Sequence, residues 1–444
     1  MLLAAGISFA VQAADKAKLY RRRTPVVDAY EKVQASVVNI SSSRVVTVSW
    51  GGLGPDIFRD IFQLPGPFGG KRRLTSLGSG FVIHADGYVV TNYHVVARAT
   101  DILVSTSDGQ EYAARLVRAD AGHDLAVLKV ETPEALPQIC LGTARDLMVG
   151  ETVIAVGNPL GYHHTVTTGV ASAVGRRLEF GGGLEYSNLI QTSAPINPGS
   201  SGGPLLNING EVVGINTAIR FDAQNIGFAM SIDELTRRLG KLLRPKGVRQ
   251  LGAGMTVKLG RKTGQSGLHV RVERLARGSS AKRAGIQPGD IIAAVEGRKI
   301  SGLADYHLAW QEVRAGQKVA VELLRPGPSG QVAKQVEVQA EYEPVADVRK
   351  LAWEKLGMRL DSSKEPSPET AGYRVMDLEA DGPARRAGMR VADLLFAIGH
   401  RQLEDSEVLA QALEEITPGQ KIILAWSRKE LRGISIQHRT LQAR

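Results

Sequence analysis

Short runs of β-branched and apolar residues, separated by two-residue turns, fill the first half of the chain. Such runs flank Asp86-Gly87, Asp108-Gly109 and Asn209-Gly210. Asp-Gly and Asn-Gly pairs favour the tight turns that connect antiparallel strands, because both residues tolerate a positive φ. Their repetition indicates antiparallel barrels rather than a parallel sheet. We therefore expect one barrel over residues 33–135 and a second over residues 145–232.

A helical pattern follows the second expected barrel. Leu235, Leu239 and Leu242 recur at the spacing of one helical face. This spacing predicts a helix over residues 232–243, and the Pro-Lys-Gly sequence at 245–247 ends it. We place a domain boundary there.

The last part of the chain contains an internal repeat. Residues 281–292 return as 384–395, and residues 316–319 return as 419–422, both 103 positions later. A unit of this length can bury its own core. We therefore expect two tandem domains rather than a solenoid of short repeats.

Candidate chemistry is concentrated in residues 199–205, which read Gly-Ser-Ser-Gly-Gly-Pro-Leu. A serine between glycines can project its hydroxyl into a cleft while neighbouring backbone N–H groups converge on one point, as acyl transfer requires. Segments rich in Gly and Ser are also common turns, so the assignment depends on a base and an acid elsewhere. Ser200 and Ser201 are both candidates for the nucleophile.

Two further positions could activate such a serine. His94 follows a predicted strand that ends near Thr91, where an imidazole can be held and still reach a cleft; a histidine packed under a loop is the structural alternative. Asp124 directly precedes an apolar strand, although an aspartate at such a place can simply terminate a turn. Asp120 and His123 are local rivals. We prefer Asp124 because a rigid strand would position its carboxylate.

The order His94, Asp124, Ser201 resembles that of the HtrA/Deg family of serine proteases, in the contexts Thr-Asn-Tyr-His-Val-Val, Asp-Leu-Ala-Val-Leu and Gly-Ser-Ser-Gly-Gly-Pro-Leu. Further matching segments, in the family's order, are residues 77–82, 155–161, 165–170, 190–198 and 225–229. The resemblance implies a mainly β fold, a chymotrypsin-like double antiparallel β-barrel followed by two PDZ domains of the α+β type. The expected domains are a trypsin-like protease domain at 27–243 and PDZ domains at 248–344 and 350–440.

Two positions depart from the family's pattern. Ser193 stands where the family usually has aspartate, and Ser200 where it usually has asparagine. The resemblance implies that residue 200 contributes mainly its backbone N–H. By register against the Gly-Gly-Pro-Leu that follows, Ser201 is the expected nucleophile. The same register implies an oxyanion hole of Gly199, Ser200 and Ser201, in which the N–H groups of Gly199 and Ser201 face the oxyanion.

The pattern Ala-x-x-Ala-Gly-[Ile/Met]-x-x-x-Asp in both repeats resembles PDZ domains. Such a domain binds an extended peptide along a sheet edge, and backbone N–H groups capture the terminal carboxylate. By position, the two expected carboxylate loops are Leu251, Gly252 and Ala253 in the first copy and Leu356, Gly357 and Met358 in the second. Alternatively, the second copy only packs against its neighbours.

The resemblance implies an ATP-independent serine endopeptidase that cleaves misfolded or unstructured polypeptides. His94 would take the Ser201 proton and Asp124 would stabilise the imidazolium. The substrate is expected to pair as a strand with Ile226, Gly227 and Phe228. The PDZ domains would bind substrate or regulatory peptides, and trimers or cages built from trimers are expected. The alternative is a latent protease that acts mainly as a chaperone or peptide-binding scaffold.

The amino-acid composition limits which classes of binding partner are expected. Of the 444 residues 43% are hydrophobic, as in soluble globular proteins, and the formal charge is +10. No Lys/Arg run is longer than residues 21–23 or 71–73, and no aromatic residues are interleaved with them, which argues against nucleic-acid binding. We interpret the charge as a solvated surface and leave membrane association open. No side-chain cluster has metal-ligand spacing, so neither a metal nor another cofactor is expected.

The chain has one cysteine and an apolar N-terminal segment. The single cysteine, Cys140, excludes an intramolecular disulfide, and its apolar neighbours predict a buried thiol. Residues 1–14 resemble the hydrophobic region of a signal peptide with a small-residue cleavage site, and export to the periplasm is the expectation. The positive residues that precede such a region are missing, so either the sequence starts late or the segment is not a signal.

Overall fold

The computed structural model describes residues 22–48, 70–158, 164–180, 184–217, 226–245, 248–261, 268–327, 330–342, 347–361, 372–399, 401–403, 406–414, 416–430 and 433–444. The chain divides into two compact units. Residues up to Arg176 and those from Asn188 to Tyr342 form the first unit, and residues 177–187 and 343–444 form the second. The expected signal peptide at 1–14 lies outside the described residues.

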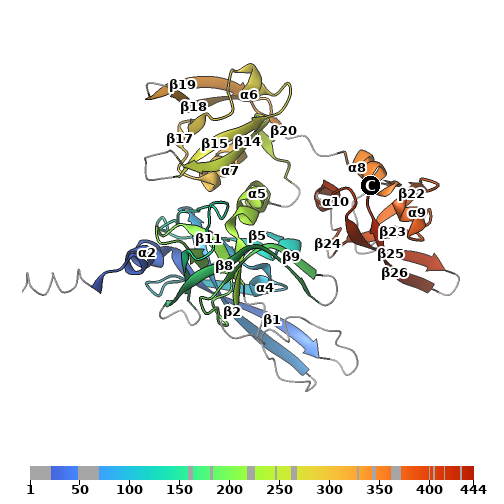
Figure 1. The fold of residues 1–444 in the computed structure, drawn as a ribbon, viewed down its shortest axis with the longest axis horizontal. Coiled ribbons are helices and arrows are strands. Elements are labelled where there is room, and N and C mark those ends of the chain that lie inside the picture. Colours follow the sequence, from blue (N-terminus) through green and yellow to red (C-terminus); the bar gives the residue numbers. More distant parts are fainter. Residues whose placement is uncertain are drawn as a thin grey trace, which may run out of the picture. The chain divides into compact units, whose positions relative to one another are not determined.

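The first barrel follows a short N-terminal helix, α2 (Pro25–Val33), and a 3-10 turn, η1 (Gln34–Ser36) (Figure 1). Its strands are β1 (Val37–Val48), β2 (Gly70–His84), β3 (Tyr88–Thr91), β4 (Asp101–Ser105), β5 (Glu111–Asp120) and β6 (Leu125–Val130). They close in the order β1-β2-β3-β6-β5-β4, and β1 pairs antiparallel with both β2 and β4. Aliphatic side chains such as Ile40, Val89 and Leu128 fill the interior.

The second barrel is also closed and six-stranded. Its strands are β7 (Thr152–Gly157), β8 (Thr165–Phe180), β9 (Leu184–Thr192), β10 (Pro204–Leu206), β11 (Val212–Thr217) and β12 (Gly227–Ser231). They close in the order β10-β11-β12-β9-β8-β7. Gly87, Gly109 and Gly210 have positive φ between consecutive antiparallel strands. The prediction of turns at these places is confirmed, but the connections are three or five residues long rather than two.

The predicted helix after the second barrel is present as α5 (Ile232–Leu242). The hydroxyl of Ser231 caps its first turn by accepting from the N–H of Asp233 at 3.3 Å. Leu235, Leu239 and Leu242 are all buried, so the predicted apolar face is confirmed.

The segment that joins the two barrels is held by strand β11. The carbonyl of Cys140 accepts from the N–H of Val212 at 2.9 Å, and the N–H of Gly142 donates back to the carbonyl of Val212 at 2.8 Å. Cys140 itself is exposed. The prediction of a buried thiol was wrong, because the apolar neighbours of Cys140 turn inward while its own side chain points out of this extended segment.

The first repeat forms an antiparallel sheet with two helices. Its elements are β13 (Leu251–Gly252), β14 (Met255–Arg261), β15 (Leu268–Leu275), α6 (Ser280–Arg283), β16 (Ile291–Val295), β17 (Arg298–Lys299), α7 (Leu303–Gln311), β18 (Lys318–Gly327), β19 (Gly330–Gln339) and β20 (Glu341–Tyr342). The sheet order is β14-β15-β16-β18-β19, which leaves β14 at one edge.

The second repeat has the same sheet order, β21-β22-β23-β25-β26. Its elements are α8 (Val348–Leu356), β21 (Met358–Leu360), β22 (Tyr373–Leu378), α9 (Pro383–Arg386), β23 (Leu394–Ile398), β24 (Arg401–Gln402), α10 (Ser406–Glu414), β25 (Lys421–Glu430) and β26 (Gly433–Gln442). The expected fold class, two antiparallel barrels followed by PDZ domains, is confirmed.

Both repeats contain the same buried ion pair at the end of the repeated pattern. Arg325 holds both carboxylate oxygens of Asp290 at 2.7 Å and donates to the carbonyl of Gly285 at 2.8 Å. Arg428 holds both oxygens of Asp393 at 2.8 Å in the same way. The two-pronged geometry joins a turn to a strand in each domain and explains the aspartate that ends the sequence pattern.

Candidate active site

The first barrel brings His94 and Asp124 together. His94 lies in α4 (Tyr93–Val96), one turn of helix directly after β3, and Asp124 lies between the 3-10 turn η2 (Ala121–His123) and β6. The Nδ1 atom of His94 is 2.7 Å from Oδ2 of Asp124. The backbone N–H of His94 donates to the other carboxylate oxygen, Oδ1, at 2.8 Å.

This double contact fixes the orientation of the imidazole ring. An ionised carboxylate only accepts, so Nδ1 of His94 carries the proton that it donates to Asp124. The remaining ring nitrogen, Nε2, then presents a lone pair and can accept a proton. Asp124 is only 2% exposed. Its backbone is left-handed, with φ 51° and ψ 42°, a conformation that few residues other than glycine, asparagine and aspartate adopt.

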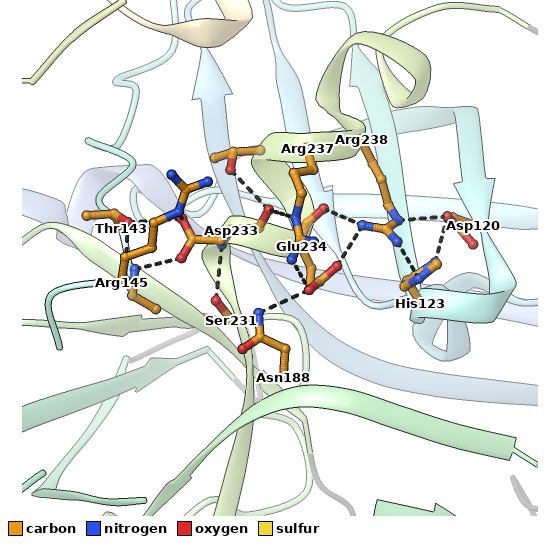
Figure 2. Close-up of polar contacts among 12 residues, drawn as sticks. Asp120, His123, Thr143, Arg145, Asn188, Ser231, Asp233, Glu234, Arg237 and Arg238 are labelled. Atoms are coloured by element: carbon orange, nitrogen blue, oxygen red, sulfur yellow. Dashed lines mark hydrogen bonds and ion pairs between the residues drawn. The ribbon is translucent and has the colours of Figure 1, made fainter. Parts of the chain in front are cut away.

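The two rival residues are engaged elsewhere. Nδ1 of His123 is 2.9 Å from Oδ2 of Asp120, and Nε2 of His123 accepts from Arg238 of α5. Figure 2 shows this pair beside the Arg238 guanidinium. The preference for Asp124 over Asp120 and His123 as the partner of His94 agrees with this geometry.

The second barrel carries the serine loop between β9 and β10. Gly199 and Gly202 have φ values of 90° and 84°, which a residue with a side chain rarely adopts. The N–H of Ser200 donates to the carbonyl of Asn197 at 3.0 Å, and the N–H of Gly202 donates to the carbonyl of Asn216 at 2.9 Å. These bonds hold the loop in a fixed tight conformation.

Ser79 of β2 joins the serine loop to the first barrel. Its N–H donates to the carbonyl of Ser201 at 2.8 Å, and its hydroxyl donates to the carbonyl of Gly199 at 2.6 Å. The same hydroxyl accepts from the N–H of Asn158 at 2.8 Å. Sequence reasoning did not single out Ser79, although it lies in the Leu-Gly-Ser-Gly segment that matched the family.

Two glycines allow the loop to approach the histidine helix. A Cβ on Gly202 would overlap with the carbonyl oxygen of Ser79 and lie 3.0 Å from the backbone nitrogen of Asn92, two residues before His94. A Cβ on Gly78 would lie 2.7 Å from the side chain of Val95 and 3.2 Å from the carbonyl oxygen of Ser201. The loop that carries Ser201 and the helix that carries His94 are therefore packed on the same short stretch of β2.

The two adjacent serines have different surroundings. Ser200 packs against β7, because a Cβ on Gly157 would lie 2.9 Å from its Oγ. Ser201 is 2% exposed and its carbonyl is bonded to Ser79. The Ser200 side chain thus lies beside β7, and Ser201 as the nucleophile stays a prediction.

The expected substrate-pairing residues lie at the start of β12. Phe228 pairs with Thr217 of β11 on one side and with Gln191 of β9 on the other. Both of its edges are therefore occupied by barrel strands, and a substrate strand has no place to pair at Phe228 itself. Gly227 pairs with Thr192, and Ile226 is exposed; for these two residues the expectation stays a prediction.

The candidate carboxylate residues differ between the two PDZ copies. In the first copy, Leu251 and Gly252 form the two-residue strand β13, and the carbonyl of the buried Ala253 accepts from the N–H of Ala281 at 3.1 Å. The edge of the neighbouring strand β14 continues from this point.

In the second copy, residues 356–358 are not a loop. Leu356 ends helix α8, Gly357 caps it with φ 65°, and Met358 begins β21. The N–H of Gly357 donates to the carbonyl of Trp353 at 3.0 Å, and a Cβ there would lie 2.8 Å from a guanidinium nitrogen of Arg444. The helix cap uses the N–H that a peptide carboxylate would need.

No helix among the described residues is long and apolar enough to cross a membrane. Within the same part of the chain, His, Cys, Asp and Glu side chains form no group of three that could hold a metal ion.

Comparison with known proteins places this geometry in a family. The model of the trypsin-like peptidase domain matches residues 78–215, and that of the PDZ domain matches residues 242–324. A probable periplasmic serine endoprotease, DegP-like, from Hahella chejuensis is 33% identical over 88% of this chain and 88% of its own length. The corresponding protein of Halomonas elongata is 34% identical over 87% of each chain. The putative serine protease HhoB of Synechocystis sp. is 37% identical over 68% of this chain and 79% of its own length.

A solved structure, the HtrA-type protease AlgW with decapeptide, shares 30% identity over 72% of this chain and 99% of its own, with a TM-score of 0.39. The two DegP-like relatives cover 87–88% of the chain, and the peptidase and PDZ matches fall on the barrels and the first repeat. The chain is therefore a serine endopeptidase of the HtrA/Deg family.

Proposed function

We propose that Ser201, His94 and Asp124 form a catalytic triad that cleaves misfolded or unstructured polypeptides without ATP. The observation that carries the proposal is the 2.7 Å contact between Nδ1 of His94 and Oδ2 of Asp124, which orients Nε2 of the imidazole as a proton acceptor. His94 takes the proton of the Ser201 hydroxyl as that oxygen attacks the peptide carbonyl, and Asp124 stabilises the imidazolium that forms. The imidazolium then returns the proton to the leaving amine.

The oxyanion of the tetrahedral intermediate needs preorganised donors. In the proposed mechanism the N–H groups of Gly199 and Ser201 supply them, since the N–H of Ser200 between them is bonded to Asn197. Removal of one such donor raises the barrier of comparable hydrolases by about 2.7–4 kcal/mol. One bond supports this role: the carbonyl of Ser200, which shares its peptide group with the N–H of Ser201, accepts from the N–H of Gly203 at 3.0 Å and so holds that peptide group in place.

Peptide recognition is proposed at two places. The substrate pairs beside Ile226 and Gly227, and a peptide C-terminus adds to the edge strand β14 of the first PDZ domain, with its carboxylate near Leu251, Gly252 and Ala253. The second PDZ domain is not proposed to bind a carboxylate through Gly357, because the N–H of that residue caps α8.

The proposed cellular compartment is taken from the names of two relatives. Two of them are named periplasmic, so we propose that this protease is exported and works on unfolded proteins in that compartment. We also propose trimers or cages built from trimers, and the three domains at 27–243, 248–344 and 350–440. A latent protease that acts mainly as a chaperone is the second candidate.

Casein degradation by the wild type and by Ser201→Ala separates the two candidates. The protease predicts rapid cleavage that Ser201→Ala abolishes. Equal and negligible cleavage by both proteins, together with retained suppression of aggregation, contradicts it and supports the chaperone. Labelling with a fluorophosphonate, followed by peptide mapping, should modify Ser201, and modification of Ser200 would overturn the choice between the two serines.

A further inference from the structure

An arginine of helix α5 connects this helix to the turn that precedes Asp124. Nη1 of Arg238 donates to Oε2 of Glu234 at 2.6 Å, and Nη2 donates to Nε2 of His123 (Figure 2). Nε of Arg238 lies 3.4 Å from Oδ2 of Asp120. The Arg238 guanidinium therefore contacts both the residue before η2 and the last residue of η2.

The connection is largely removed from solvent. The side chains of Arg238 and Glu234 are 10% and 6% exposed, and those of His123 and Asp120 are 13% and 12% exposed. A guanidinium can only donate, so Nε2 of His123 accepts from Arg238 and its Nδ1–H donates to Asp120. Each partner depends on the next, and loss of one leaves a buried charge without compensation.

The backbone conformation just after the η2 turn is one that contacts from outside the turn can stabilise. Asp124 directly follows this turn in the left-handed conformation, which costs most residues with a side chain about 1–2 kcal/mol and costs aspartate less. A strained backbone of this kind persists only where the surroundings over-determine it. Contacts of Arg238 at both ends of the turn, Asp120 and His123, supply that determination next to the carboxylate that orients His94.

The same network reaches the second barrel. Oε1 of Glu234 accepts from Nδ2 of Asn188 in β9 at 3.0 Å. Glu234 and Arg238 thus connect a strand of the barrel that carries Ser201 to the turn of the barrel that carries Asp124. Figure 2 shows the sequence Asn188, Glu234, Arg238, His123 and Asp120 as one chain of polar contacts.

We propose that Arg238 and Glu234 are positioning residues of the protease. They hold the η2 turn so that the Asp124 carboxylate stays bonded to His94, and they fix this turn relative to the barrel of the nucleophile. The proposal rests on the proposed function, since it presupposes that His94 and Asp124 act on Ser201. Neither Arg238 nor Glu234 contacts the reacting atoms in this scheme.

The test compares four variants of the full-length protein with the wild type. Arg238→Ala removes the guanidinium. Arg238→Lys keeps the positive charge but not the several N–H donors of the planar guanidinium, and Glu234→Gln keeps the shape of the acceptor without its charge. Arg237→Ala is the matched control, because Arg237 is the neighbour of Arg238 on α5 and also bonds Glu234. The Arg237 side chain is 54% exposed, and it bonds Glu234 and Asp233 of the same helix rather than the η2 turn. kcat and KM for an unstructured fluorogenic peptide, the rate of fluorophosphonate labelling and the urea midpoint are measured for each.

A positioning role predicts a loss in kcat at nearly constant KM. A misplacement of about 1 Å can cost on the order of 100-fold in rate, so we expect Arg238→Ala to lower kcat by that order per folded molecule, with KM within about twofold. Fluorophosphonate labelling slows in parallel. Arg238→Lys and Glu234→Gln recover part of the rate, because each keeps some of the hydrogen bonds. Arg237→Ala turns over like the wild type.

Two results would overturn the positioning role. One is a wild-type kcat per folded molecule in Arg238→Ala or, if that variant does not fold, in both Arg238→Lys and Glu234→Gln. The other is an equal loss in Arg237→Ala. Cleavage of casein by Ser201→Ala would instead overturn the proposed function, and this inference with it, so the two failures are told apart by the Ser201 variant alone.

Discussion

The Asp124 carboxylate makes two bonds to the same residue, and these bonds predict the effect of an amide in its place. Oδ1 accepts from the backbone N–H of His94, so an amide oxygen must occupy that place and the NH₂ group must face Nδ1. The imidazole then carries its proton on Nε2 and cannot accept one from Ser201. We expect Asp124→Asn to lower kcat by about 10⁴, with little change in the urea midpoint.

The control for this prediction is Asp108→Asn in the turn between β4 and β5. Asp108 is exposed and its partner is the hydroxyl of Thr106 in the same turn. Both variants remove one negative charge, but Asp108 has no contact with His94 and is exposed, whereas Asp124 is buried against it. Turnover of Asp124→Asn within tenfold of Asp108→Asn would show that this carboxylate does not set the tautomer.

At the residue scale, the sequence predicted those residues whose role is marked by the few residues next to them in the chain. The contexts of His94, Asp124 and Ser201 predicted which residues to compare, and the short contact between His94 and Asp124 agrees with that choice. Ser79 and Arg238 were not predicted, because Ser79 bonds Gly199 and Arg238 bonds His123, each more than a hundred positions away, and no local pattern marks a hydroxyl or guanidinium for such a contact.

At the scale of elements, the serine loop depends on a glycine for two separable reasons. Gly202 and Gly109 share the same φ of 84°, but a Cβ on Gly202 would overlap with Ser79 and Thr91, whereas a Cβ on Gly109 would meet nothing within 4 Å. Gly109→Ala should cost only the left-handed strain, about 1–2 kcal/mol. Gly202→Ala should cost about 2–5 kcal/mol and abolish peptide cleavage, because it adds overlap with β2.

Urea unfolding and casein cleavage of the two alanine variants check this comparison. Equal losses of stability would mean that backbone strain alone decides both positions. Cleavage by Gly202→Ala at the rate of Gly109→Ala would show that the close approach of the serine loop to β2 is not needed for activity.

The repeated ion pair of the PDZ domains allows a second prediction at this scale. The side chains of Asp393 and Arg428 are 2% and 17% exposed, so Asp393→Ala leaves a guanidinium nearly buried without its carboxylate. We expect a loss of about 3–5 kcal/mol in the second PDZ domain. Asp377→Ala is the control, since Asp377 is 53% exposed in an ion pair with Arg359 and should cost at most about 1 kcal/mol. Thermal unfolding of the two variants measures the difference, and equal melting temperatures would contradict the prediction.

Elements were predictable where turns or helical periodicity mark them. Both barrels and α5 followed from Asp-Gly and Asn-Gly turns and from the spacing of three leucines. The second carboxylate loop was assigned only by its place relative to the repeat, and the structure has a helix end there instead. Conformation at Gly357 is decided by the cap of α8 and by Arg444 at the far end of the chain, which position in the repeat does not reveal.

For the molecule as a whole, one histidine of the first unit makes stability depend on pH. His307 of α7 lies against Gly240 of α5 and beside the ring of Tyr306, and desolvation together with the positive charge of Arg244 lowers the pKa of His307 to about 4. The unfolded chain binds a proton at this residue below pH 6.5, whereas the folded protein does so only near pH 4. Folding is therefore weakened progressively as the pH falls from 6.5 to 4, by on the order of 2 kcal/mol from this residue.

His307→Gln removes this titration. We expect the urea midpoint of the wild type to fall more steeply between pH 6.5 and 4.5 than that of His307→Gln, and the two curves to run parallel above pH 7. His438→Gln, in the second unit and exposed, serves as the control and should follow the wild type. Parallel curves for wild type and His307→Gln over the whole range would rule out the lowered pKa of His307.

Cys140 has a practical consequence for following this molecule in solution. It is the one thiol in the sequence and it is exposed, on the segment that connects the barrels and is bonded to Val212. Neighbouring atoms desolvate the sulfur and raise the pKa of Cys140, so a maleimide dye will attach slowly at neutral pH and faster in mildly alkaline buffer. The native chain thus accepts a single fluorophore without mutagenesis, at a joint whose environment changes if the two barrels separate.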